Sequence, residues 1–227
     1  MSAAEAEQVT TQRESGATTL SQEIRFFASQ TNAQLIAGSL ALVAVVRLAI
    51  GGWRWPDLII VGAFIALEPF IEWMIHVFIL HWKPKQLFGR KVDPLLARKH
   101  RAHHRDPRRT DWIFIPFPVL LQVIPISMLL YLLIMPTLRL ALTTAVTGLA
   151  ILLTYEWTHY LIHSRYKPKS RLYKFVWRAH RLHHFKNENY WFGVTMHAGD
   201  FVLGTFPAKE DVETSATCKT LGVAEQV

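Results

Sequence analysis

Long apolar runs, separated by polar and basic segments, dominate the pattern along the chain. Four runs are each close to the ~20 residues that a helix needs to cross the hydrocarbon of a bilayer. The connections at 51–52 and 135–137 are short, so we expect the runs to form two helical hairpins. The pattern therefore predicts an all-α, polytopic membrane protein. The predicted spans are residues 34–50, 58–80, 112–135 and 138–162.

Two of these runs contain residues that disturb a regular span. Arg47 lies in the first run, and we expect its long side chain to reach the membrane interface. The third run contains Pro116, Pro118 and Pro125, so we expect that span to be bent or partly re-entrant.

Polar segments flank the runs. Residues 1–33 are polar and lack the basic start and apolar core of a cleaved signal peptide, so we expect a tail there. The sequence thus predicts a membrane-embedded domain over 34–206, with a second polar tail over 207–227.

Positive charge is concentrated in two segments. Of the 25 Lys and Arg residues, ten lie in 83–109 and eight in 165–186, and the net charge is +8. The positive-inside rule places both segments, and with them both termini, in the cytoplasm. We expect most of these charges to form a solvated surface facing lipid headgroups. Nucleic-acid binding is not expected, because the segments are rich in histidine and lack a recognisable reader module.

The histidines gather where apolar runs meet the basic segments. Ten of the eleven fall into four groups, and the eleventh, His197, follows thirteen residues after the last group. On a helix the spacings i, i+3 and i+4 share one face, so three of the groups should each present imidazoles together. The first group is spaced by five residues and would diverge by ~140°, so its members serve different metals unless the helix loosens near Leu80. The groups are His76 and His81; His100, His103 and His104; His159 and His163; and His180, His183 and His184.

This pattern predicts a metal centre. Neutral imidazole is a common ligand of transition metals, and ten are too many for one tetrahedral zinc, which favours two ions. Ligating histidines generally donate their other N–H to a carboxylate or a carbonyl. Glu72 and Glu156 lie within one helical turn of histidines in apolar runs, so we expect them to be such partners. Asp200 is a further candidate partner, and we expect His197 near the site without an obligatory ligand role.

Four stretches carry a family resemblance: HVFILHWKP, HRAHH, HYLIH and HRLHHF. In order and spacing they resemble the histidine boxes of the fatty acid hydroxylase superfamily, which includes sterol desaturases and fatty acid 2-hydroxylases. The first box, with four residues between its histidines, is more similar to the 2-hydroxylase branch. The later FGVTMHAGDFVLGTF is similar to the closing segment of the family. The resemblance covers roughly residues 60–206.

The resemblance implies a four-helix membrane anchor whose cytoplasmic cap holds two metal ions on the ten histidines. It implies O₂-dependent hydroxylation of a lipid acyl chain delivered from the bilayer, at a non-haem di-iron site. Zinc has no redox role and cannot itself activate O₂, so iron is the expected metal, although zinc can occupy such a site in purified protein.

The electrons for this chemistry need a separate source. Residues 1–33 are too few for the fused haem domain that some 2-hydroxylases carry, and they contain no histidine. A G-x-G-x-x-G dinucleotide motif is absent as well. We therefore expect a separate donor, a ferredoxin or a b-type cytochrome with its reductase.

Three alternatives remain open at this point. A desaturase or a sterol or carotenoid oxidase would use the same scaffold. A histidine-rich metal transporter belongs to a different class, but its ligands would lie near the membrane midplane and not at the ends of spans. A membrane metalloprotease would need H-E-x-x-H, which is absent.

Overall fold

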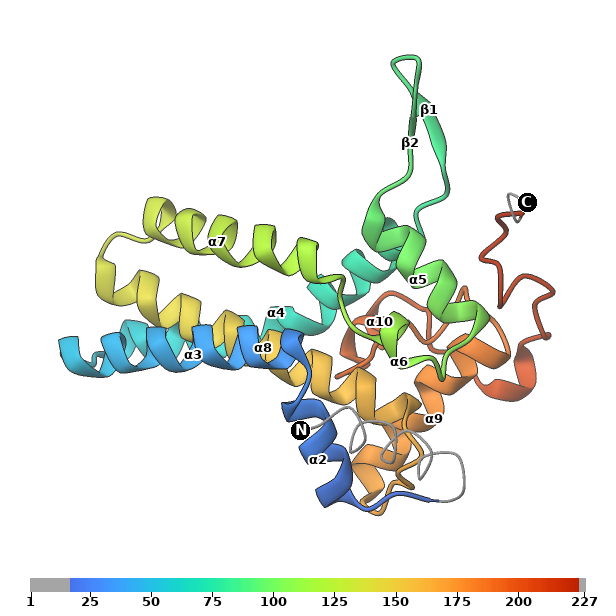
Figure 1. Ribbon diagram of the computed structural model, residues 1–227, viewed down its shortest axis with the longest axis horizontal. Helices are drawn as coiled ribbons and strands as arrows, with labels where there is room; N and C mark the ends of the chain where they lie inside the picture. The colour runs from blue at the N-terminus through green and yellow to red at the C-terminus, as the bar shows by residue number, and fades with distance from the viewer. Residues whose placement is uncertain (1–16, 225–227) are drawn as a thin grey trace.

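The computed structural model describes residues 17–224 of the chain. The structure is mostly helical, with one two-stranded antiparallel hairpin. Helices α3, α4, α7 and α8 extend together to the left of Figure 1, whereas α5, α9 and α10 gather at the right. The elements are α2 (Leu20–Ala28), α3 (Thr31–Ile50), α4 (Trp55–Ile75), the π-helix η1 (His76–Leu80), β1 (Lys85–Leu87), β2 (Arg90–Val92), α5 (Leu95–Arg105), α6 (Thr110–Ile113), α7 (Phe117–Ile134), α8 (Leu138–His163), α9 (Arg171–Phe185), α10 (Ala198–Val202) and the 3₁₀ turn η2 (Lys209–Asp211).

Four helical segments of the described chain are long and apolar enough to cross a membrane. They carry large apolar side chains on their outer faces: Leu58 is 75% exposed and Leu133 is 71% exposed. Such surface is stable against lipid and costly against water. The predicted all-α polytopic fold is therefore confirmed. The segments are Thr31–Ile50, Trp55–Leu80, Thr110–Ile134 and Leu138–His163.

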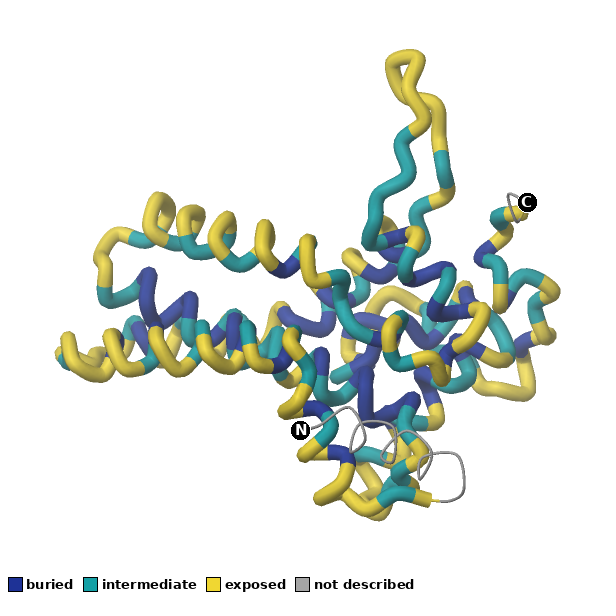
Figure 2. Tube along the Cα trace, in the orientation of Figure 1, coloured by how far each residue is buried: buried dark blue, intermediate teal, exposed yellow. Residues whose placement is uncertain are grey.

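The interior of the bundle is built around α8. Val43 of α3 packs with Leu142, Ala145 and Leu149 of α8 in one buried cluster. Buried residues become denser where the spans meet the cap, which we define as residues 81–109 and 164–224 (Figure 2). The spans thus form a lipid-facing stem, and many buried residues lie where the stem meets the cap.

Arg47 is buried among the spans, and its predicted place at the membrane interface stays a prediction. Its side chain is 1% exposed and ion-pairs with Asp57 at 2.7 Å. It also donates to Thr143 Oγ1 and to the Gly51 carbonyl, both at 2.7 Å. A charge buried in an apolar bundle needs partners, and the α3–α4 turn, α4 and α8 supply them. Arg47 therefore ties three spans together at the end remote from the cap.

The third span is divided by its prolines. Residues 114–116 interrupt the helix between α6 and α7, and Pro116 caps the start of α7. Pro125 is accommodated inside α7. The break is useful because it delivers the Ile115 amide to Glu156 of α8 at 2.9 Å.

Both flanking segments contact the membrane domain where they are described. Phe27 of α2 packs against Phe114, Trp157 and Tyr160, and the Tyr160 hydroxyl donates to Glu23. In the C-terminal segment Val212, Cys218 and Leu221 are buried. The predicted boundaries at 34 and 206 stay a prediction, and residues 1–16 of the predicted tail lie outside the described part.

Candidate metal centre

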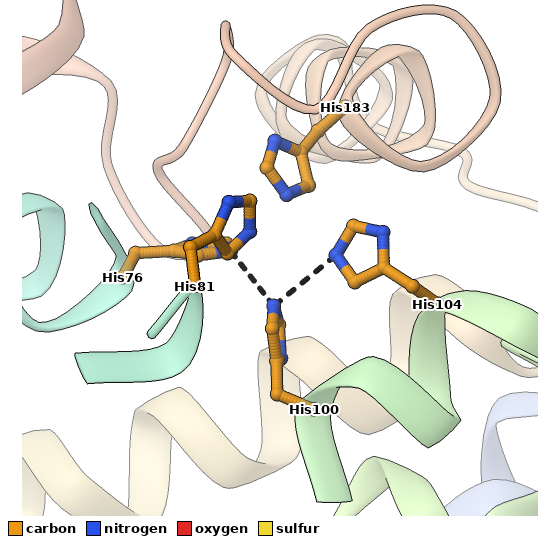
Figure 3. Close-up of side chains that lie close together, drawn as sticks. All are labelled: His76, His81, His100, His104 and His183. Carbon is orange, nitrogen blue, oxygen red and sulfur yellow. Dashed lines mark hydrogen bonds between the residues drawn. The ribbon is translucent and has the colours of Figure 1, made fainter. Parts of the chain in front are cut away.

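The ten box histidines converge where the stem meets the cap. They form two groups of five, and within each group the ligand atoms lie within 4.8 Å of one another. Figure 3 shows the first group, with rings from η1 and the residue that follows it, from α5 and from α9 turned toward a common centre. The first group is His76, His81, His100, His104 and His183; the second is His103, His159, His163, His180 and His184.

The two H-x-x-H-H boxes are divided between the groups. On α5, His100 and His104 belong to the first group and His103 to the second. Residues i and i+4 lie on the same face of a helix, whereas i+3 points slightly to one side, so one box supplies ligands for two centres. On α9 the division is reversed: His180 and His184 belong to the second group and His183 to the first. The rings of His104 and His184 stack with centroids 4.1 Å apart, so the two groups adjoin.

A π-helical turn solves the spacing problem of the first box. The His81 amide donates to the His76 carbonyl at 3.0 Å, an i to i+5 bond. This wider turn brings residues five apart onto one face, and the two rings lie 4.9 Å apart. Both histidines therefore join the same group, and the loosening near Leu80 that the sequence left open is what occurs.

Burial keeps the cap histidines neutral. It lowers the pKa of the His183 imidazole to about 4, and it holds the pKa values of His100, His103 and His184 well below 6.5. Neighbouring imidazoles lower the pKa of these last three further, because each would repel a second positive charge. At neutral pH these nitrogens therefore have free lone pairs, which is the form that binds a metal.

Backbone carbonyls fix the ring orientation in the first group. Nδ1 of His76 donates to the Phe192 carbonyl at 2.6 Å, and Nδ1 of His183 donates to the Tyr190 carbonyl at 2.8 Å. Nδ1 of His104 donates to the Cys218 carbonyl at 2.8 Å. A carbonyl can only accept, so the hydrogen of each neutral ring lies on Nδ1 and Nε2 is a bare acceptor facing the group.

These acceptors fit a cation. His100 Nε2 lies 3.2 Å from His76 Nε2 and 3.1 Å from His104 Nε2, as the dashed lines of Figure 3 show. A neutral His100 has one hydrogen at most for those two bare acceptors. Within residues 17–224, six further ring nitrogens of the two groups are buried without a hydrogen-bond partner, on His81, His103, His159, His180, His183 and His184. An all-nitrogen donor set of this kind fits a transition metal in each group.

A short loop connects the first group to two carboxylates. Asp200 accepts from the amides of Phe192 and Gly193 at 2.9 and 2.8 Å, and Glu72 accepts from the amides of Val194 and Thr195. A side chain at Gly193 would meet the Met196 carbonyl at 2.3 Å, so only glycine fits this turn. The loop carries the Phe192 carbonyl that orients His76.

Among the predicted carboxylate partners, Glu72 and Glu156 contact backbone amides and not histidine rings. Glu72 accepts hydrogen bonds from the loop, and Glu156 accepts one from the Ile115 amide. Asp200 contacts a histidine, but it is His197, at 2.9 Å. His197 belongs to neither group and its ring packs against Phe175 and Phe206.

An apolar cavity of about 180 Å³ reaches the first group from the stem. One face of α4 and one face of α8 form its main walls. His76 lines it at the cap end, so a chain lying in the cavity meets the metal group. The other lining residues are Glu68, Ile71, Glu72, Ile75, Leu80, Leu96, Ile115, Gly148, Ile151, Leu152 and Tyr155.

The fatty acid hydroxylase family model matches residues 61–205, more than half of the chain. The chain belongs to the fatty acid hydroxylase family. The resemblance inferred from the four boxes is confirmed, and all four lie within the matched range.

Two curated proteins to which this family member is similar are named as 2-hydroxylases. The chain is 29% identical over 159 residues to a dihydroceramide fatty acyl 2-hydroxylase of Arabidopsis thaliana, covering 69% of this chain and 64% of the relative. It is 31% identical over 163 residues to a fatty acid 2-hydroxylase of Homo sapiens, covering 70% of this chain and 42% of the relative. The chain therefore spans less than two thirds of either curated relative.

The fold of this family member is similar to a solved structure. That structure is full-length Scs7p, in which only the hydroxylase domain is visible. The TM-score is 0.65 at 20% identity, over 82% of this chain and 70% of the other. The likeness supports the arrangement of stem and cap described above.

Proposed function

We propose that this protein is a membrane-embedded oxygenase that hydroxylates the acyl chain of a lipid. One observation carries the proposal: two five-histidine groups adjoin, and an apolar cavity between two spans ends at one of them. The relatives named above act on fatty acyl substrates, which is consistent with a cavity of this shape and polarity.

The ten histidines are the proposed ligands of two iron ions, five for each ion. Bound iron would supply the redox chemistry that activates O₂ and cleaves an unactivated C–H bond. In the balance of the reaction, one oxygen atom enters the C–H bond and the other leaves as water, which consumes two electrons and two protons. The chain itself holds the ligand rings in place, through the carbonyls of Phe192, Tyr190 and Cys218.

The cavity has a positioning role in this proposal. Ile71 and Ile75 of α4 face Ile151 and Leu152 of α8, and together they exclude water from the acyl chain. An acyl chain gains little hydrophobic free energy by moving from the bilayer into an apolar cavity, because it is already out of water. The contribution of the cavity is therefore to hold the chain in a fixed position beside His76.

We further propose that the cap faces the cytoplasm and receives electrons from a separate acidic carrier. The basic segments 83–109 and 165–186 form much of the cap, which agrees with the positive-inside rule. A second cavity of about 590 Å³, lined by both polar and apolar side chains, lies beside His163. Arg108, Arg165, Lys167 and Arg181 line it, so an anionic surface would bind close to the second group.

A desaturase or a sterol or carotenoid oxidase is the alternative that shares the site. Lipid profiling distinguishes these outcomes, because hydroxylation adds one oxygen and desaturation removes two hydrogens. A metal transporter is a weaker alternative, since the histidines lie at the ends of spans and in the cap.

The test is to express the chain with iron and a carrier–reductase pair and to profile total lipids by mass spectrometry. We expect oxygenated acyl lipids from the wild type and none from His103→Ala, with membrane insertion unchanged. Arg98→Ala is the matched control, because Arg98 is an exposed residue on the same helix α5. A fully active His103→Ala variant would remove that residue from the ligand set.

A further inference from the structure

The hairpin of β1 and β2 projects from the body of the described chain, and Figure 2 shows its outer part as exposed. Every residue of the two strands is exposed except Val92, which is half-buried. An isolated two-stranded hairpin is at best marginally stable in water unless it packs on something. The hairpin therefore indicates a surface outside the chain. Its antiparallel pairs are Lys85 with Val92, Gln86 with Lys91, and Leu87 with Arg90.

Phe88 at the tip of the hairpin is fully exposed, in a backbone conformation that does not suit it. Phe88 and Gly89 form the two-residue loop, and their φ angles of 51° and 74° are the pattern of a type I′ turn. Asn or Asp is preferred at the first of these positions, and a bulky residue there is strained. In water Phe88 would thus cost stability without gaining any packing. An apolar environment outside the chain accounts for it.

Basic residues flank this apolar tip. Residues 83–92 contain Lys83, Lys85, Arg90 and Lys91 and no acidic residue. At the base of the hairpin, Lys85 Nζ lies 4.8 Å from the ring centroid of Trp82. A cluster of Lys and Arg that immediately follows a membrane span is typical of binding to anionic lipid, and tryptophan is enriched at the membrane interface.

The hairpin begins where a membrane span ends. The second span of the described chain ends at Leu80, and residues 81–84 connect it to β1. Figure 1 shows that the hairpin projects sideways, across the direction of the stem helices and not along it. A segment that leaves the end of a span in this direction runs beside the bilayer surface and does not extend away from it into water.

We propose that the β1–β2 hairpin docks on the surface of the bilayer that the stem crosses. Phe88 enters the boundary between headgroups and acyl chains, and Lys85, Arg90 and Lys91 bind the phosphates of anionic lipids. Their long side chains can keep the charge among headgroups while the apolar stems lie deeper. The hairpin is then a second membrane contact, separate from the four spans and independent of the proposed chemistry.

Photo-crosslinking tests this contact directly. Benzoylphenylalanine replaces Phe88 in the full chain, which is reconstituted in vesicles of phosphatidylcholine with or without phosphatidylglycerol. Lipid adducts are then identified by mass spectrometry of the intact protein. The same label at Leu133, which is exposed on the stem, is the positive control, and the label at Glu210, which is exposed on the cap, is the negative control. We expect lipid adducts at positions 88 and 133 and none at position 210.

Charge variants test the preference for anionic lipid. We expect more adducts at position 88 when phosphatidylglycerol is present. Lys85→Gln, Arg90→Gln and Lys91→Gln should each lower that yield by up to about fivefold at low salt, since one cation near an anionic surface contributes a factor of that size. Lys209→Gln is the matched control, because Lys209 is an exposed lysine on η2, and it should leave the yield unchanged.

Hydrogen exchange separates docking from the stability of the turn itself. Phe88→Asn introduces a residue that the type I′ turn favours. If Phe88 had only a structural role, the amides of residues 85–92 would exchange at the same rate or more slowly in this variant. If the ring holds the hairpin on lipid, they should exchange several-fold faster than in the wild type when both proteins are in vesicles.

The inference is overturned if position 88 yields no more lipid adducts than position 210, or if Phe88→Asn leaves exchange unchanged or slower. Cross-links between two copies of the chain in place of lipid adducts would show a protein interface and would overturn it as well. None of these measurements uses bound metal or turnover, so failure of the proposed function and failure of this inference are distinguishable.

Discussion

Replacing Asp200 by asparagine should weaken one metal group selectively. The carboxylate is fully buried and accepts four hydrogen bonds. Oδ1 accepts from the Phe192 amide at 2.9 Å and from Thr205 Oγ1 at 2.6 Å. Oδ2 accepts from the Gly193 amide at 2.8 Å and from His197 Nδ1 at 2.9 Å. Burial raises the pKa of Asp200, but these donors outweigh it and the pKa lies below its ordinary value.

The magnitude follows from which donors can adapt. Asparagine presents an NH₂ group at one of the two oxygen positions. Thr205 and His197 can reverse their roles and accept, but the amides of Phe192 and Gly193 cannot. One buried backbone N–H is therefore left without an acceptor in either orientation, which costs about 1–3 kcal/mol. For a chain of this size we expect the unfolding temperature to fall by several degrees.

The functional effect should be confined to the first group. Disturbing Phe192 displaces the carbonyl that orients His76, and loss of such a partner typically lowers metal affinity roughly 10–100-fold. The assay is chelator competition on purified protein, followed by metal analysis. We expect Asp200→Asn to release one ion at lower chelator concentration while the second is retained as in the wild type.

Asp211→Asn is the matched control, because Asp211 is an exposed acid in the same C-terminal part of the chain. It should change neither unfolding temperature nor metal retention. Equal metal retention by Asp200→Asn and the wild type would refute the reasoning that links this carboxylate to His76.

Three further predictions follow from the described contacts. Arg47→Met leaves Asp57 buried without its ion-pair partner and should cost about 3–5 kcal/mol of stability, measured by thermal unfolding in detergent; an unchanged unfolding temperature would contradict the pairing. Acidification should release metal and destabilise the fold. The His183 pKa is about 4 in the folded protein and 6.5 in the unfolded chain, so the unfolded chain binds the proton first. The roughly 3 kcal/mol that the neutral ring contributes to folding stability is therefore complete above pH 6.5 and is lost as pH falls toward 4. Metal retention that does not change between pH 7 and pH 4 would speak against this. The charge reversals Arg165→Glu and Lys167→Glu should slow electron delivery from an acidic carrier at low salt and leave reduction by dithionite unchanged; equal carrier rates would show that docking occurs elsewhere.

Much of the stem could be predicted from sequence because span length and apolar composition are local properties. The four spans agree with the predicted ones to within a few residues. The contacts of Arg47 could not be predicted, because its partners Asp57 and Thr143 lie in two other spans, and nothing near Arg47 in the sequence reveals them. The break in the third span, at Phe114 to Pro116, was indicated by prolines, because a proline disturbs the helix at its own position.

The grouping of the histidines shows where sequence reasoning stops. Spacing placed His100, His103 and His104 on one helix face, but their division between two groups depends on where the fold places the histidines of the other elements. The carbonyls of Phe192, Tyr190 and Cys218 were missed because every residue has a carbonyl, so its use leaves no mark in the sequence. Glu72 and Asp200 were noticed as buried or nearby acids, but their loop contacts required the fold.

The most direct test of the central claim is the number of metal ions per chain. Protein loaded anaerobically with iron is compared with His183→Ala, from the first group, and His180→Ala, from the second, both on α9. We predict two ions in the wild type and, in each variant, selective loss of the ion held by the altered group. A wild type that binds one ion or none after loading, with both variants unchanged, would contradict the two-centre account.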